Sequence, residues 1–199
     1  MRLPDRPGSL GAVATVMGAT GVDIEAVEIV EKGDGIAIND FVLKLPCDVL
    51  PDSLVSSCSE IEGVRVMWMS RVPDRWQLDS DIEALDSMVN NPERALEVLV
   101  GVAPEVFHCQ WALALDEAGQ PAVGTDLAPE LAADAIERLR PLDQAHALEL
   151  PADWTPGWGD TALAVVPASG GRTVVVGRRG GPVFLPSEVR RLAHLAAMA

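Results

Sequence analysis

The chain has 199 residues, of which 48% are hydrophobic and 23% charged. It can therefore bury a core, which excludes a disordered or fibrous protein. Its formal net charge of -15 at pH 7 would repel nucleic acid and anionic membranes, because both are bound through Lys and Arg. We expect neither nucleic acid nor a membrane as a partner.

The cysteines and the absence of export signals indicate where the protein works. Cys47, Cys58 and Cys109 fall in no close pair, which matches neither a disulfide framework nor a zinc site. No apolar segment typical of a signal peptide follows Arg2, and no apolar run reaches about 18 residues. These observations predict a cytoplasmic protein, and no motif calls for a metal or another cofactor.

A break in the hydrophobic pattern predicts two domains, residues 1–72 and 81–199, joined by a linker at 73–80. Acidic residues are concentrated after the break: 17 of the 30 lie in residues 76–170, whereas residues 171–199 hold five bases and one acid. We expect the basic C-terminal segment to pair with the acidic surface.

The first domain has the predicted order α, β, β, α, β. Helical spacing after Pro7 predicts a helix up to Gly18, and a Gly-rich turn at 32–35 joins strands at 22–30 and 36–45. A helix follows at 51–62 and a strand at 64–69. A βαββαβ pattern needs one more strand in front, and residues 1–3 supply only a stub of about 10 Å. We expect either a start further upstream or a partner chain that covers the gap.

The second domain begins with a helix at 80–89, whose residues Ile82, Leu85 and Val89 are predicted to face inward. A second helix follows Asn91. Short apolar runs between turn signals then predict an antiparallel sheet. The expected strands are 108–115, 121–124, 146–150, 161–166 and 173–177, with helices at 129–139 and 186–198.

Catalytic groups are scarce. The chain has no Tyr, two Lys and three separated His, and it lacks the short motifs of hydrolases, nucleotide-binding loops and metalloproteases. His108 and Cys109 could form a nucleophilic site, although a buried core Cys is the commoner case. Asp34 and Asp40 flank a turn that could bind a cation, and a solvated turn is the commoner case there too. We expect a protein that is not an enzyme.

Residues 3–10 read Leu-Pro-Asp-Arg-Pro-Gly-Ser-Leu, and after the predicted helix residues 21–24 read Gly-Val-Asp-Ile. A helix N-terminus with unsatisfied amides suits the carboxylate of a small ligand. With these motifs, residues 3–70 resemble an ACT domain, a ferredoxin-like βαββαβ module that senses amino acids. The resemblance implies an α+β fold and a homodimer.

In that family an amino acid binds between the Pro-Gly loop of one copy and the start of the second strand of another. The resemblance thus implies a ligand site on two segments. These are Asp5, Arg6, Gly8, Ser9 and Leu10 on one side, and Gly21, Val22, Asp23 and Ile24 on the other. Asp5 and Asp23 stand where serine-binding members often have Asn, and an ionised carboxylate cannot donate a hydrogen bond. Branched-chain amino acids, aromatic amino acids or no ligand at all remain open.

The region after Asp79 resembles a small GAF-like α/β sandwich. The resemblance rests on two leading helices, a meander of strands, and a Val-Val-Val-Gly-Arg-Arg-Gly-Gly-Pro-Val-Phe ending at 174–184. Within that ending, Arg178, Arg179, Gly180 and Gly181 could cradle an anion, or form an exposed turn that pairs with the acidic segment. Of the five Trp, Trp154 and Trp158 flank a Pro- and Gly-rich loop that is an unusual core element.

The sequence therefore predicts a non-catalytic amino-acid sensor that acts through an ACT-domain dimer. Its alternative is a regulatory subunit that docks an enzyme and binds no ligand of its own.

Overall fold

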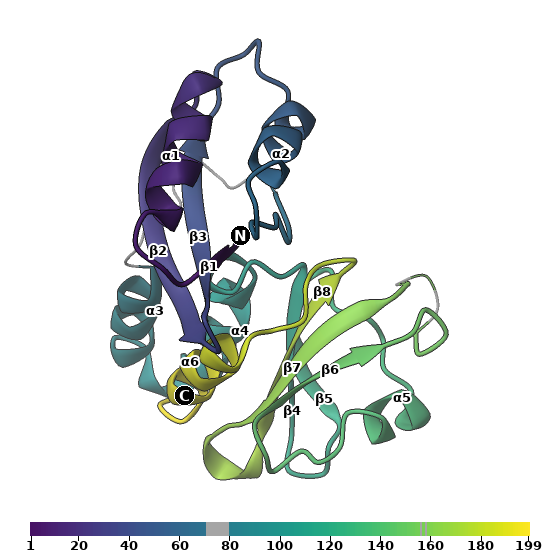
Figure 1. Ribbon diagram of the computed structural model, residues 1–199. Coiled ribbons are helices and arrows are strands. Elements are labelled where there is room, and N and C mark those ends of the chain that lie inside the picture. The colour runs from purple at the N-terminus through teal and green to yellow at the C-terminus, as the bar shows by residue number, and fades with distance from the viewer. Residues whose placement is uncertain (71–79, 156, 158) are drawn as a thin grey trace. The chain divides into compact units, whose positions relative to one another are not determined.

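The computed structural model describes residues 1–70, 80–155, 157 and 159–199 (Figure 1). The chain divides into two compact units, residues 1–71 and 72–199, and each unit is described by itself. Apart from Ser80, the linker predicted at 73–80 lies outside the described residues, as do Trp76 and Trp158.

The first unit is an antiparallel sheet of three strands in the order β1-β3-β2, with two helices packed on one face (Figure 1). Its elements are β1 (Arg2–Pro4), α1 (Ser9–Ala19), β2 (Asp23–Gly33), β3 (Ile36–Lys44) and α2 (Pro51–Ser59). Leu3, Val13, Met17, Leu54 and Cys58 form the centre of its core. The predicted helices and hairpin of this unit are confirmed.

The turn between β2 and β3 explains why these strands pair. Asp34 and Gly35 have φ values of 53° and 74°, and Gly33 pairs with Ile36 on either side of them. A two-residue loop with positive φ at both positions matches the right-handed twist of the flanking strands, and Asp-Gly is a favoured pair for it. The turn fixes the hairpin register.

The strand predicted at 64–69 is wrong as a regular strand. Only Arg65 pairs, in an isolated antiparallel bridge with Arg2, and the two residues exchange N–H to carbonyl hydrogen bonds of 2.8 and 2.9 Å. The side chains still alternate, since Val64 is buried and Arg65 exposed. The ladder does not extend because β1, its neighbour, is only three residues long.

The second unit is built on a five-stranded antiparallel sheet in the order β5-β4-β8-β7-β6. Short 3-10 turns at Pro92–Arg94 and Ser169–Gly171 complete it. Its other elements are α3 (Ser80–Val89), α4 (Ala95–Val106), β4 (Trp111–Leu115), β5 (Pro121–Gly124), α5 (Ala133–Glu137), β6 (His146–Leu150), β7 (Thr161–Pro167), β8 (Thr173–Arg179) and α6 (Pro186–Ala196). The antiparallel sheet predicted for this part of the chain is confirmed.

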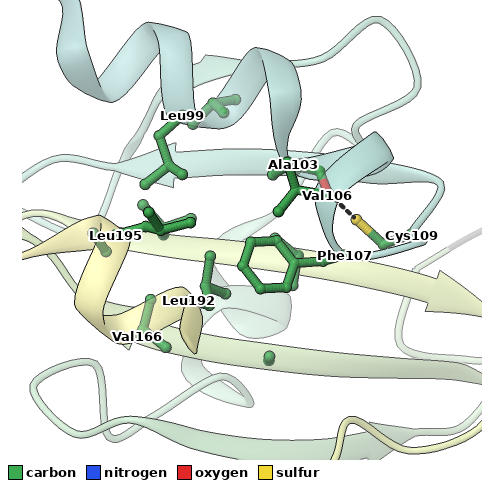
Figure 2. Close-up of a cluster of buried hydrophobic side chains, with 14 of the residues drawn as sticks. Leu99, Ala103, Val106, Phe107, Cys109, Val166, Leu192 and Leu195 are labelled. Carbon is green, nitrogen blue, oxygen red and sulfur yellow. Dashed lines mark hydrogen bonds between the residues drawn. The ribbon is translucent and has the colours of Figure 1, made fainter. Parts of the chain in front are cut away.

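The two faces of this sheet hold two different cores. On one face, small side chains such as Ala112 and Ala164 lie under α4 and α6. Short side chains on the sheet allow these helices to pack close to it. Figure 2 shows Leu99 and Phe107 from the α4 region together with Leu192 and Leu195 of α6 in this core. The other face carries the larger side chains Trp111, Leu113, Leu115, Leu163, Val165 and Val175, packed against Ala135, Ile136 and Leu139 of the α5 region.

Helix α3 has the predicted bounds but not the predicted inner face. Ala84 and Met88 are buried, with Leu85 packed partly against the core, whereas Ile82 and Val89 are 67% and 68% exposed. The face of α3 that packs on the core is therefore centred on Ala84 and Met88, next to the predicted face. Among the described residues, no helix combines the length and the apolar character needed to cross a bilayer.

Candidate functional site

The loop before α1 is the first half of the predicted ligand site. Gly8 precedes the helix with φ 93°, and no side chain caps the helix start. The first N–H that bonds back along the helix belongs to Ala12, 2.9 Å from the Gly8 carbonyl oxygen. Leu10 is 42% exposed. This end of the helix presents backbone amides and an apolar side chain at the surface.

Asp5 is tied to the β2–β3 hairpin by both its backbone and its side chain. Its N–H donates to the Gly35 carbonyl over 2.8 Å, and its carboxylate lies 2.9 Å from the Lys32 ammonium. Both side chains of this ion pair are substantially exposed, so the pair contributes little to stability. Arg6 is exposed and forms no ion pair with a described residue. Within this loop its guanidinium can therefore meet an anionic group.

The second half of the predicted site follows the other end of α1. Gly21, with φ 79°, ends the helix, and the Val22 N–H donates to the Met17 carbonyl over 3.1 Å. Val22 is buried in the core and Ile24 packs partly against it. Asp23 is exposed at the first position of β2. Of the four residues, only Asp23 offers a charged side chain to a ligand.

The two halves are separated by the whole length of α1. Eleven helical residues span roughly 16 Å at 1.5 Å per residue. A single copy therefore does not bring the Asp5–Leu10 loop and the Gly21–Ile24 turn around one small molecule. A site that uses both segments requires two copies of the chain.

Cys109 is not placed to act as a nucleophile. Its thiol is buried, with the sulfur 3.5 Å from the Ala103 carbonyl oxygen (Figure 2) and 3.4 Å from the Trp111 carbonyl oxygen, and its one proton is donated weakly to these acceptors. Burial raises the pKa of Cys109 to about 12, and nearby Arg178 offsets this only in part. Because the thiolate is the reactive form, the catalytic alternative loses its nucleophile.

The interpretation of Arg178 as part of an anion cradle or an exposed turn is wrong. Arg178 is 2% exposed, and its guanidinium donates to the carbonyl oxygens of Phe107, His108 and Pro182 at 2.8 to 3.2 Å. It also forms an ion pair with Glu188. The guanidinium is thus engaged inside the unit, and of the two arginines only Arg179 is exposed.

The remaining polar candidates are dispersed. No group of three His, Cys, Asp or Glu side chains in the described ranges is arranged to hold a metal ion. His146 Nδ1 lies 2.9 Å from the Gln144 carbonyl oxygen. Asp34 occupies the hairpin turn, and Asp40 stands opposite Glu28 across the β2–β3 pair, where two carboxylates repel each other.

Two of the five Trp form a core pair. The ring centroids of Trp111 and Trp154 are 6.3 Å apart at an interplanar angle of 24°, and Trp154 is 4% exposed. The expectation that the Trp154 loop is not a core element is therefore wrong for Trp154. The neighbouring Thr155 is equally buried, and neither its hydroxyl nor the Trp154 N–H has a partner among the described residues.

The second unit also has an open hollow of about 570 Å³ that no sequence motif predicts, lined by Asp116, Glu117, Ala118, Gly170 and Arg172. The side chains of Asp116 and Arg172 are engaged by the fold. Asp116 Oδ1 accepts the N–H groups of Ala118 and Gln120, and Arg172 donates to the Ser169 carbonyl oxygen. The hollow has no signal in the sequence because it joins two distant loops.

No protein-family model matches this sequence, and no curated protein matches it. What the chain does must be inferred from its own residues and their geometry.

Proposed function

We propose that the chain is a non-catalytic, cytoplasmic regulatory protein that binds an amino acid at a homodimer interface of its first unit. That unit would be an ACT domain with the ferredoxin-like βαββαβ pattern. The element order β1, α1, β2, β3, α2 supports this proposal. The Arg2–Arg65 bridge supports it too, because it sets the segment after α2 beside β1.

The observation that carries the proposal is the uncapped, exposed start of α1 after Gly8. The backbone amides of Leu10 and Gly11 would receive the carboxylate of the amino acid, assisted by the unpaired Arg6. Asp23 of a second copy would receive its ammonium group. Leu10 would contact the side chain of the ligand, which favours an apolar amino acid.

Regulation would follow from differential affinity. A ligand held between two copies stabilises the dimer arrangement that closes the site, and it shifts the population only by the difference in its affinity for the two arrangements. The second unit, a GAF-like sandwich in this proposal, would relay that shift or add a second signal.

Calorimetric titration of the full chain with each of the twenty amino acids tests the proposal. We expect heat with an apolar amino acid. Replacing Asp23→Asn should weaken binding about tenfold, because a charge-assisted hydrogen bond is lost. Asp126→Asn changes an exposed carboxylate of the second unit and should leave the affinity unchanged. No heat with any amino acid would contradict the sensor function.

One observation favours the alternative, a regulatory subunit that docks an enzyme without a ligand. The Asp5 carboxylate, in the loop before α1, already has an ion-pair partner in Lys32. This charged group of the loop therefore needs no ligand to pair with. In that case the same titrations give no heat, and an enzyme copurifies with the chain in stoichiometric amount.

A further inference from the structure

Helix α3 carries an apolar stripe that the rest of the second unit, as far as it is described, leaves uncovered. Ile82 and Val89 are 67% and 68% exposed, and Leu85 is only partly buried. The three residues stand at positions i, i+3 and i+7 of one helix, so they form a single line about 10 Å long. Aliphatic side chains exposed along one line of a helix are typical of an interaction surface.

The helix is held to the second unit by its other side. Ala84 and Met88 are each 2% exposed, and the Asp81 carboxylate lies 3.0 Å from Arg191 Nε of α6. The stripe is therefore presented by an anchored helix. Burying it needs no refolding of the unit.

The charges beside the stripe select the partner. Helix α3 contains Asp81, Glu83 and Asp86 and no basic residue. Asp86 follows Ile82 by one helical turn, and neither it nor Glu83 forms an ion pair with a described residue. The nearest following base, Arg94, is paired with Glu97 at 2.7 Å. Glu83 and Asp86 therefore make one border of the stripe negative, whereas Asp81 is neutralised by Arg191.

This charge disfavours pairing of α3 with α3 of a second copy, because like charges would face each other across the contact. We propose that the stripe of Ile82, Leu85 and Val89 docks an amphipathic helix of a protein partner that has an apolar seam flanked by Lys or Arg. The i, i+3, i+7 spacing fits the seam of another helix. The basic flanks would meet Glu83 and Asp86.

A pair of designed peptides tests this on the full chain. One 21-residue peptide has Leu at the a and d positions of each heptad and Lys at e and g, and its partner has Glu in place of Lys. Fluorescence anisotropy should show the Lys peptide binding at least about tenfold tighter at low salt, with the difference shrinking as salt rises.

Variants separate this surface from general attraction to an acidic protein. Ile82→Gln with Val89→Gln should weaken the Lys peptide about tenfold, since the buried apolar contact is lost while helix propensity is kept. Leu127→Gln removes another largely exposed aliphatic side chain of the unit, 60% exposed, and should leave the affinity for the Lys peptide unchanged. Glu83→Gln with Asp86→Asn leaves the apolar packing intact and should reduce the salt dependence.

Three results would overturn the proposal. The first is equal binding of the Lys and Glu peptides. The second is binding that the Ile82 and Val89 substitutions leave unchanged, which means that the peptide attaches elsewhere on the acidic surface. The third is a wild-type oligomer that sedimentation shows to dissociate in the same variant, which means that a second copy covers the stripe.

Discussion

Arg178 at the end of β8 and Glu188 in the first turn of α6 form a buried ion pair, with Arg178 Nη2 2.8 Å from Glu188 Oε1. Their side chains are 3% and 14% exposed. The other carboxylate oxygen of Glu188 accepts the Leu185 N–H over 2.8 Å. The guanidinium also lies over the Phe184 ring, 4.1 Å from its centroid. The pair therefore fixes where α6 begins relative to the sheet.

Replacing Arg178→Met should lower the free energy of unfolding by about 3–5 kcal/mol, because it leaves the buried Glu188 charge uncompensated and removes the donor to the Phe107 and His108 carbonyls. Denaturant unfolding measures this. Arg190→Met, on the exposed side of α6, should stay within about 0.5 kcal/mol of the wild type. A loss below about 1 kcal/mol for Arg178→Met would show that the pair contributes little beyond its desolvation.

Gly177 is the second position where packing dictates the residue. A β-carbon there would lie 2.1 and 2.2 Å from two carbons of the Trp111 ring, so Trp111 must move. We expect Gly177→Ala to cost about 1–3 kcal/mol and to change the Trp fluorescence. Gly101→Ala in α4, where a β-carbon meets nothing within 4 Å, should stabilise by about 0.5–1 kcal/mol. Equal effects of the two substitutions would contradict this packing argument.

Local sequence patterns predicted most helices and strands of this chain, because the formation of these elements depends largely on residues close together in the sequence. The bounds expected for β5 and β6 are those observed, and the inward residues Val189, Leu192 and Leu195 of α6 are buried. The inner face of α3 was missed because small Ala84 and flexible Met88 pack inward in place of the β-branched Ile82 and Val89. Helical periodicity alone does not determine which of two adjacent apolar stripes meets the core.

Contacts between residues far apart in the sequence could not be predicted from local patterns. Two of the three carbonyl acceptors of Arg178, those of Phe107 and His108, lie about 70 positions away in the sequence, so a local Arg-Arg-Gly-Gly motif could not reveal them. In the candidate site, the helix start after Gly8 followed from the sequence, whereas the Asp5–Lys32 ion pair depends on how the hairpin folds back beside the loop. Any meeting of Asp5 with Asp23 depends on a second copy.

The buried hydroxyl of Thr155 should destabilise the fold. Thr155 is 4% exposed and its Oγ1 has no hydrogen-bond partner among the described residues. Thr155→Val replaces the hydroxyl by a methyl group and should raise the free energy of unfolding by about 1 kcal/mol. Thr161→Val is the matched control: Thr161 is 1% exposed and donates to the Gly159 carbonyl over 3.1 Å, so that change should destabilise by about 1 kcal/mol. A less stable Thr155→Val would mean that the hydroxyl has an acceptor.

The three thiols should differ sharply in reactivity. Cys47 is exposed, whereas Cys58 and Cys109 are buried. Because burial raises the pKa of Cys109 to about 12 from an ordinary 9.0, its thiolate fraction at pH 8 is lower by about a thousandfold than that of an ordinary thiol. A disulfide reagent should label one thiol rapidly in the native protein and three after denaturation. Cys47→Ser should abolish the rapid phase, and its persistence would show that a buried thiol is accessible.

The same raised pKa links Cys109 to stability at alkaline pH. The folded state holds the thiol proton more tightly than the unfolded chain, so this stabilisation is fully present below about pH 9 and is lost as pH rises toward 12. Over that range Cys109 alone should lower the free energy of unfolding by up to about 1.4 kcal/mol per pH unit. Cys109→Ala should be less stable at pH 7, because it leaves a cavity, but its stability should fall less steeply above pH 9. Parallel pH profiles of the two proteins would contradict the assignment.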